Sequence, residues 1–175
     1  MLNKINFLFV TLFGVGKIKK IPGSIASLLT TIFLFFLFHV LNFSPQIILI
    51  SVIVIFFISL YSVNIFIKNL DNKDPKEVVI DEFIGQSIPI CLYEIAHEGA
   101  KETDQVLKFY FIMFVLFRIF DIVKPYPVSY YDKNFKNSFG VIMDDVAAGL
   151  YVVAVLVLYM VLSSWKNFLK KLSVY

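Results

Sequence analysis

The chain has 175 residues, of which 59% are hydrophobic and only 17% are charged. Soluble domains are about 45–50% apolar and about 25% charged, so this composition does not fit a water-exposed globular surface. The net charge of +3 is too small for a protein that binds nucleic acid through phosphates, and a single cysteine, Cys91, excludes an internal disulfide. We therefore expect residues 1–175 to form one membrane-embedded domain.

A stretch without Asp, Glu, Lys or Arg runs from Ile21 to Ile67. It is too long for one membrane helix, and Asn42–Pro45 is its only turn signal. We predict two spanning helices, Ser24–Leu41 and Gln46–Ile67, because each has about the 20 residues that cross a ~30 Å hydrocarbon core.

Three further membrane helices are predicted downstream. Val146–Trp165 is uncharged, whereas Val78–Ala96 and Gln105–Val123 carry charged residues and are predicted as shorter, tilted or re-entrant helices. The apolar run Ile5–Val15 is too short to span, and lysines rather than a cleavage site follow it, so we expect an interfacial segment. The predicted fold class is all-α, a polytopic membrane bundle of about five membrane-embedded helices plus this short N-terminal segment.

Basic residues are distributed unequally between the predicted loops. Those on the side where the first span begins are Lys4, Lys17, Lys19, Lys20, Lys68, Lys73, Lys76, Arg118, Lys124, Lys133 and Lys136. Only Lys101 and Lys108 lie on the other side, so the positive-inside rule places the first side in the cytoplasm. The tail lysines Lys166, Lys170 and Lys171 disagree, because five spans leave them outside. The helical spacing of apolar residues in the tail also fits an interfacial helix.

Five carboxylates lie at the cytoplasmic ends of the predicted helices, namely Asp81, Glu82, Asp121, Asp144 and Asp145. Placing a carboxylate in hydrocarbon costs about 2.5–3.5 kcal/mol, and clustering adds mutual repulsion. A hard cation offsets both costs, and oxygen ligands without His or Cys suit Mg²⁺, or Mn²⁺ as a substitute. The alternative is that these acids only cap helix N-termini, but this does not account for Asp121 at a helix C-terminus.

Basic and small residues face the acids from the same side. Lys20 precedes Gly23, which would let the backbone approach a ligand, and Ser24, a predicted N-cap whose helix start offers free N–H groups to a phosphate. Arg118 is predicted either to pair with the acid one turn later or to clamp a phosphate. Lys124 is predicted to contact a lipid headgroup or to extend to the interface. The lysines before the first span also fit the positive-inside rule without any ligand.

Other chemistries are excluded by residue type and position. His39 and His97 lie toward the outer side, and Cys91 has no basic neighbour that would lower its pKa. No G-x-x-x-x-G-K-[ST] motif occurs, which argues against a nucleotide-driven pump. Metal-assisted chemistry on a phosphorylated substrate at the inner leaflet remains.

Five sequence blocks follow one another between about Phe13 and Gly149. They are Phe13–Gly16, Pro22–Leu28, Asp74–Pro75 together with Val79–Gly85, Phe117–Pro125 and Gly140–Gly149. Their combination and order resemble the bacterial phosphatidylglycerophosphatase A family. The chain departs from the family pattern where Leu12, Ala26 and Asn137–Ser138 replace glycines, which affects the phosphate loops rather than the acidic centre.

This resemblance implies a Mg²⁺-dependent, helical inner-membrane enzyme that removes the terminal phosphate of the phospholipid phosphatidylglycerophosphate. The five acids are then the expected catalytic and metal-binding residues, which hold Mg²⁺ and orient water, or one of which attacks phosphorus directly. The expected phosphate-binding residues are Lys20, Gly23, Ser24, Ser27, Arg118 and Lys124. Two alternatives stay open: an alcohol phosphotransferase acting on nucleotide-activated lipids, whose Asp-Gly-x-x-Ala-Arg block is absent, and a divalent-cation transporter, whose sites usually lie at the midplane.

Overall fold

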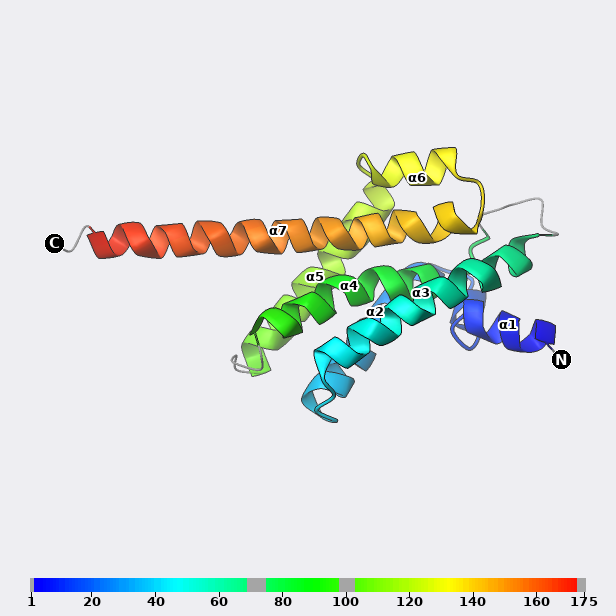
Figure 1. Ribbon diagram of the computed structural model, residues 1–175, viewed down its shortest axis with the longest axis horizontal. Helices are drawn as coiled ribbons and strands as arrows, with labels where there is room; N and C mark the ends of the chain where they lie inside the picture. Colours follow the sequence, from blue (N-terminus) through cyan, green and yellow to red (C-terminus); the bar gives the residue numbers. More distant parts are fainter. Residues whose placement is uncertain (1, 69–74, 98–102, 173–175) are drawn as a thin grey trace.

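The computed structural model describes residues 2–68, 75–97 and 103–172. Within these ranges the chain is helical and has no strand, which confirms the predicted all-α class. The elements in chain order are α1 (Leu2–Val10), the 3-10 helix η1 (Val15–Lys17), α2 (Pro22–His39), α3 (Pro45–Ile67), α4 (Ile80–His97), α5 (Thr103–Val123), α6 (Val128–Asn134) and α7 (Ser138–Leu172) (Figure 1).

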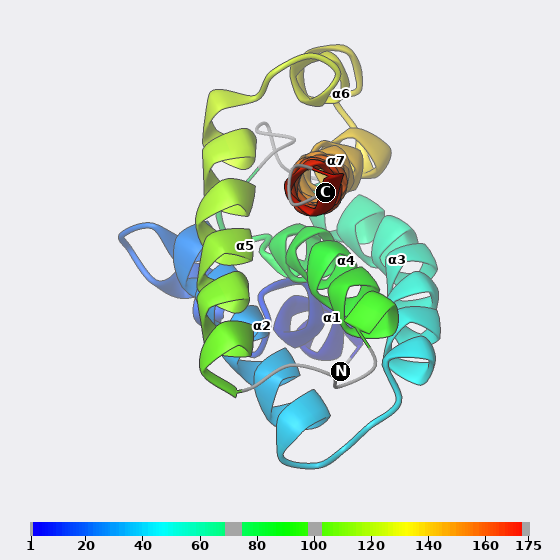
Figure 2. The ribbon, with the colours of Figure 1, turned by 90° about the vertical axis from the view of Figure 1, so that its left-hand side faces the viewer.

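The central helix of the bundle is α4. Helices α2, α3, α5 and α7 all pack against it, and the end-on view in Figure 2 shows it surrounded by its neighbours. Eleven of its 18 residues are buried, against five of 23 in α3, whose outward face is apolar. Such an apolar outer face suits lipid, whereas the polar residues of α4 are enclosed by protein.

In the part of the chain that the structure describes, three helices are long and apolar enough to cross a membrane: α2, α3 and the Ser138–Trp165 part of α7. This is fewer than the five predicted. Both α4 and α5 have sufficient length, but α4 carries Asp81, Glu82 and Glu94, and α5 carries four charged residues. We counted both among about five membrane-embedded helices, as shorter, tilted or re-entrant ones, but their charged residues leave them outside the set that is apolar enough to span.

The observed start of α2 differs from the predicted one. The helix begins at Pro22, and the preceding Ile21 has a left-handed backbone with φ 49°. Proline is well suited to a first helical position because its φ is already helical and it has no N–H to satisfy there. Ser24 therefore lies in the first turn and is not the N-cap that we predicted.

The observed start of α7 lies well before the predicted Val146. Asn137 Oδ1 accepts a hydrogen bond of 3.1 Å from the backbone N–H of Gly140, which satisfies a donor of the first turn. As a result, Asp144 and Asp145 lie inside α7 and do not open it. At its other end the helix runs unbroken to Leu172, so the tail continues α7 and is not a separate interfacial helix.

Several remaining predictions concern short segments. The predicted interfacial run Ile5–Val15 contains most of α1 and the turns that lead into η1. The seven-residue α6 was not predicted because it is too short to show an apolar period. Lys73, Asp74 and Lys101, together with the side chains of the tail lysines, lie outside the described residues.

Polar side chains link the buried faces of the helices. On α2, the hydroxyls of Ser27 and Thr30 donate to backbone carbonyls of the preceding turn, each at 2.9 Å, so they are satisfied without water. Near the C-terminal ends of α2 and α4, Glu94 Oε1 accepts a 2.9 Å hydrogen bond from the Tyr110 hydroxyl and lies 3.1 Å from His39 Nε2. This network joins α2, α4 and α5.

Candidate active site

Two glycines bring the acidic ends of α4 and α7 together. A Cβ atom on Gly149 would lie 2.3 Å from the Gly85 carbonyl oxygen, and one on Gly85 would lie 2.6 Å from the Asp145 carbonyl oxygen. Pro89 has no N–H to donate to the Gly85 carbonyl four residues earlier, so this carbonyl is free to face α7. Only glycine permits this backbone contact, which fixes Asp145 beside the first turn of α4.

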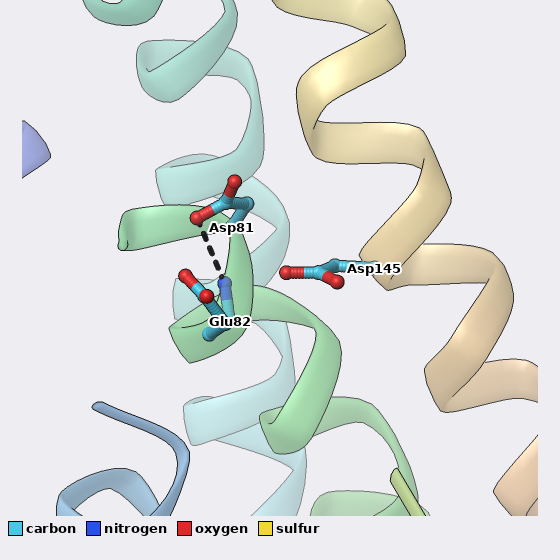
Figure 3. Close-up of side chains that lie close together, drawn as sticks. All are labelled: Asp81, Glu82 and Asp145. Atoms are coloured by element: carbon cyan, nitrogen blue, oxygen red, sulfur yellow. Dashed lines mark hydrogen bonds between the residues drawn. The ribbon is translucent and has the colours of Figure 1, made fainter. Parts of the chain in front are cut away.

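Three carboxylates meet at this crossing. Asp81 and Glu82 project from α4 and Asp145 from α7, and one oxygen of each lies within 4.8 Å of the others (Figure 3). At this separation each ionised pair repels by about 3 kcal/mol at an effective dielectric constant of about 20. Glu82 Oε2 is buried and has no hydrogen-bond partner in the described part of the chain. The group therefore has oxygen ligands at a spacing that suits a hard divalent cation, and the unpartnered Glu82 Oε2 is one of them.

Asp121, the fourth predicted ligand, is paired with arginine. Arg118 Nη1 lies 2.8 Å from Asp121 Oδ2 and 4.0 Å from Glu82 Oε1, and it donates a 3.3 Å hydrogen bond to Ser27 Oγ on α2. Arg118 Nε is buried and has no acceptor among the described residues. The arginine thus joins three helices and retains a donor for a ligand.

The fifth predicted ligand, Asp144, is paired with lysine. Lys124 Nζ lies 2.7 Å from Asp144 Oδ2 and 2.7 Å from Asp132 Oδ1, so it ties the end of α5 to α6 and α7. Burial lowers the pKa of Lys124, but the charges and hydrogen bonds of Asp144 and Asp132 outweigh that effect and raise its pKa well above the usual value. Lys124 is therefore a permanent cation at this site.

An open pocket of about 460 Å³ contains all five acids at the end of the bundle where α2 and α4 begin. Of the predicted phosphate-binding residues, Gly23, Ser24, Arg118 and Lys124 line it. Ser27 is buried behind Arg118, and the exposed Lys20 is not among the lining residues. The predicted phosphate-binding residues do not include Lys19 and Lys76, which line the rim of the pocket.

Gly23 makes room for a protein side chain. A Cβ atom at this position would lie 1.9 Å from Glu82 Oε1 and 3.4 Å from Arg118 Nη1. The absence of a side chain at Gly23 therefore sets where the Glu82 carboxylate lies. From the sequence alone, we had interpreted this glycine as space for a ligand.

These features define a class: a helical membrane protein with a carboxylate- and arginine-lined pocket at one end of its bundle. The sequence model of the phosphatidylglycerophosphatase A family matches residues 8–160, and the chain belongs to this family. It is accordingly an enzyme, a phosphatase.

Curated relatives match most of the chain. It is 34% identical over 155 residues to phosphatidylglycerophosphatase A of Haemophilus influenzae, covering 89% of this chain and 88% of that protein. It is 29% identical over 154 residues to phosphatidylglycerophosphatase A of Escherichia coli, covering 87% and 81%. A Bacteroides thetaiotaomicron protein named "Putative phosphatidylinositol-3-phosphatase" is 34% identical over 141 residues, covering 79% and 83%. No solved structure matches the chain.

Proposed function

We propose that this phosphatase hydrolyses the terminal phosphate monoester of phosphatidylglycerophosphate, giving phosphatidylglycerol and inorganic phosphate. The observation that carries this proposal is the pocket itself, where three converging carboxylates face an arginine with an unused buried donor. The two relatives named phosphatidylglycerophosphatase A support the choice of substrate.

We assign the metal site to Asp81, Glu82 and Asp145, with Mg²⁺ as the ion. Bound there, Mg²⁺ would supply Lewis-acid stabilisation of charge on a phosphoryl oxygen. Asp121 and Asp144, which are already paired, would hold Arg118 and Lys124 in place around the phosphate. Arg118 would donate from Nε to a phosphoryl oxygen, with Gly23 and Ser24 in the adjacent first turn of α2.

One of the carboxylates would also act as the general base or as the nucleophile of the reaction. Either one of them accepts a proton from the attacking water, or one attacks phosphorus and forms an acyl phosphate that water then hydrolyses. Trapping the acyl phosphate with hydroxylamine would identify the second route.

We place the site at the cytoplasmic face of the bacterial inner membrane. The predicted excess of basic residues at this end of the bundle supports that orientation. The acyl chains would then stay in the bilayer while the phosphorylated headgroup enters the pocket from the membrane surface.

Purified protein in neutral detergent tests the proposed activity. We expect it to release inorganic phosphate from phosphatidylglycerophosphate with Mg²⁺ and to lose this activity in EDTA. No release, or release that EDTA leaves unchanged, would contradict the substrate or the metal. Phosphatidylinositol 3-phosphate is the second substrate to assay, because the Bacteroides relative carries that activity in its name. Faster hydrolysis of phosphatidylinositol 3-phosphate than of phosphatidylglycerophosphate would contradict the proposed substrate.

A further inference from the structure

Two rim lysines of the pocket, Lys19 and Lys76, differ from the deeper cations. Both side chains are exposed, and neither makes an ion pair with a carboxylate in the described part of the chain. Arg118 and Lys124, in contrast, are held by Asp121 and by Asp144. Among the described residues, the rim therefore presents positive charge that no ion pair compensates.

The loops that carry these lysines are packed against each other. A Cβ atom on Gly16 would lie 1.9 Å from the Glu77 carbonyl oxygen, so the turn of η1 touches the backbone next to Lys76. The Val79 N–H also donates a 3.0 Å hydrogen bond to the Val10 carbonyl at the end of α1. Backbone contacts thus hold the two lysine-bearing loops at the same rim.

The interior and the rim of the pocket carry opposite charge. Five carboxylates and two cations line the interior, so with all of them ionised and one bound Mg²⁺ the formal charge of the interior is −1. A phosphate monoester can be drawn to the metal and Arg118, but a second anionic group of the same substrate would be repelled from this interior. The rim lysines are the cations available to such a group.

We propose that Lys19 and Lys76 bind the second phosphate of the lipid, the phosphodiester between its headgroup and its diacylglycerol. This inference rests on the proposed substrate and extends it, because the two lysines then select a lipid with two phosphates. The product phosphatidylglycerol keeps this diester, so the same lysines also bind the product.

Two competitive inhibitors report separately on binding at the rim and binding in the interior of the pocket. Phosphatidylglycerol carries only the diester, whereas inorganic phosphate probes the interior. For the K19Q/K76Q double variant in neutral micelles, we expect KM for phosphatidylglycerophosphate and Ki for phosphatidylglycerol to rise about tenfold. The Ki for inorganic phosphate should stay within about twofold of the parent value. The matched control is Lys133→Gln, an exposed lysine of α6 outside the pocket, which should change none of these constants.

Three outcomes would overturn the inference in an active double variant. They are an unchanged Ki for phosphatidylglycerol, an equal rise of both inhibition constants, and a defect seen in anionic vesicles but absent from neutral micelles. The last would mean that the lysines bind bulk anionic lipid. Failure of the parent protein to release phosphate from phosphatidylglycerophosphate would instead refute the proposed function.

Discussion

At the residue scale, the site consists of carboxylates in two different situations. Asp121 and Asp144 each have a cation within 2.8 Å, whereas Asp81, Glu82 and Asp145 converge on one another. Under the metal assignment that we propose, substitutions in the converging group should affect metal binding directly. Substitutions in the paired group should act through the position of Arg118 or Lys124.

Asp81→Asn and Asp145→Asn each replace one charged oxygen donor in the converging group. We expect each variant to lose about 100-fold or more in kcat and to bind Mn²⁺ more weakly, with little change in helix content. Phosphate release, titration calorimetry with Mn²⁺ and circular dichroism measure these effects. Asp104→Asn, at an exposed position in the first turn of α5, is the matched control and should behave like the parent protein. Near-normal turnover of both site variants would refute the metal assignment.

Gly23→Ala places a methyl group where Glu82 Oε1 now lies. The carboxylate must move, so we expect kcat to fall about tenfold or more while the fold is retained. Gly14→Ala is an informative comparison because nothing lies within 4 Å of its added Cβ, although its φ of 99° makes any side chain strained. That variant should lose about 1 kcal/mol of stability and keep its kcat. Equal activity of the two variants would contradict the role of Gly23.

At the element scale, the crossing of α4 and α7 determines the geometry of the acidic group. The backbones touch at Gly85 and Gly149, close to the carboxylates, so a small separation of the helices moves Asp145 away from Glu82. The arginine and lysine pairs add links from α5 to α2, α6 and α7. The acidic site is therefore held together by contacts among five helices, α2, α4, α5, α6 and α7.

Gly85→Ala and Gly149→Ala should each force this crossing apart. The new methyl groups meet backbone atoms, which cannot rotate away, so we expect a loss of about 1–3 kcal/mol of stability together with reduced turnover. Thermal unfolding in detergent and phosphate release measure both. Ala154→Val adds volume at an exposed position of the same helix and should leave both unchanged. Unaltered unfolding temperatures in the glycine variants would contradict this contact.

At the scale of the whole molecule, the pocket and the His39–Glu94 pair lie at opposite ends of the bundle. The start of α2 and the end of α5 are at the pocket, whereas the turn between α2 and α3 is at the other end (Figure 1). If the pocket faces the cytoplasm, these two ends differ in their access to a reagent that cannot cross the membrane.

Cysteine labelling tests this orientation. We expect Lys133→Cys on α6 to react with an impermeant maleimide only when the cytoplasmic face is exposed, and Gln46→Cys at the start of α3 only from the other face. The native Cys91 is buried and should not react with the maleimide. Labelling of the parent protein, which has only this cysteine, measures that background. The reverse pattern would place the pocket outside.

The sequence was sufficient to predict the all-α class and the uncharged helices α2 and α3, but not the number of helices apolar enough to span. Runs of uncharged residues locate α2 and α3 to within about two residues, because a stretch of that length without charge has few other stable conformations. The predicted start of α7 was wrong because a local hydrogen bond, donated by the Gly140 N–H to Asn137 Oδ1, caps the helix there, and hydropathy does not report it. Charge alone could not show that α4 is central, since burial depends on which helices surround it.

The sequence by itself determined that this chain is an all-helical membrane protein with acids near helix ends. Composition and the lengths of uncharged runs can be read directly along the chain, without knowing how the helices pack. Only the tertiary structure decided which acids face one another, because that depends on the close contact of Gly85 and Gly149, which lie 64 positions apart. The same contact distinguishes the converging carboxylates from the paired ones. Separate backbone contacts, between Gly16 and Glu77 and between Val79 and Val10, bring the loops of Lys19 and Lys76 to the rim of the pocket.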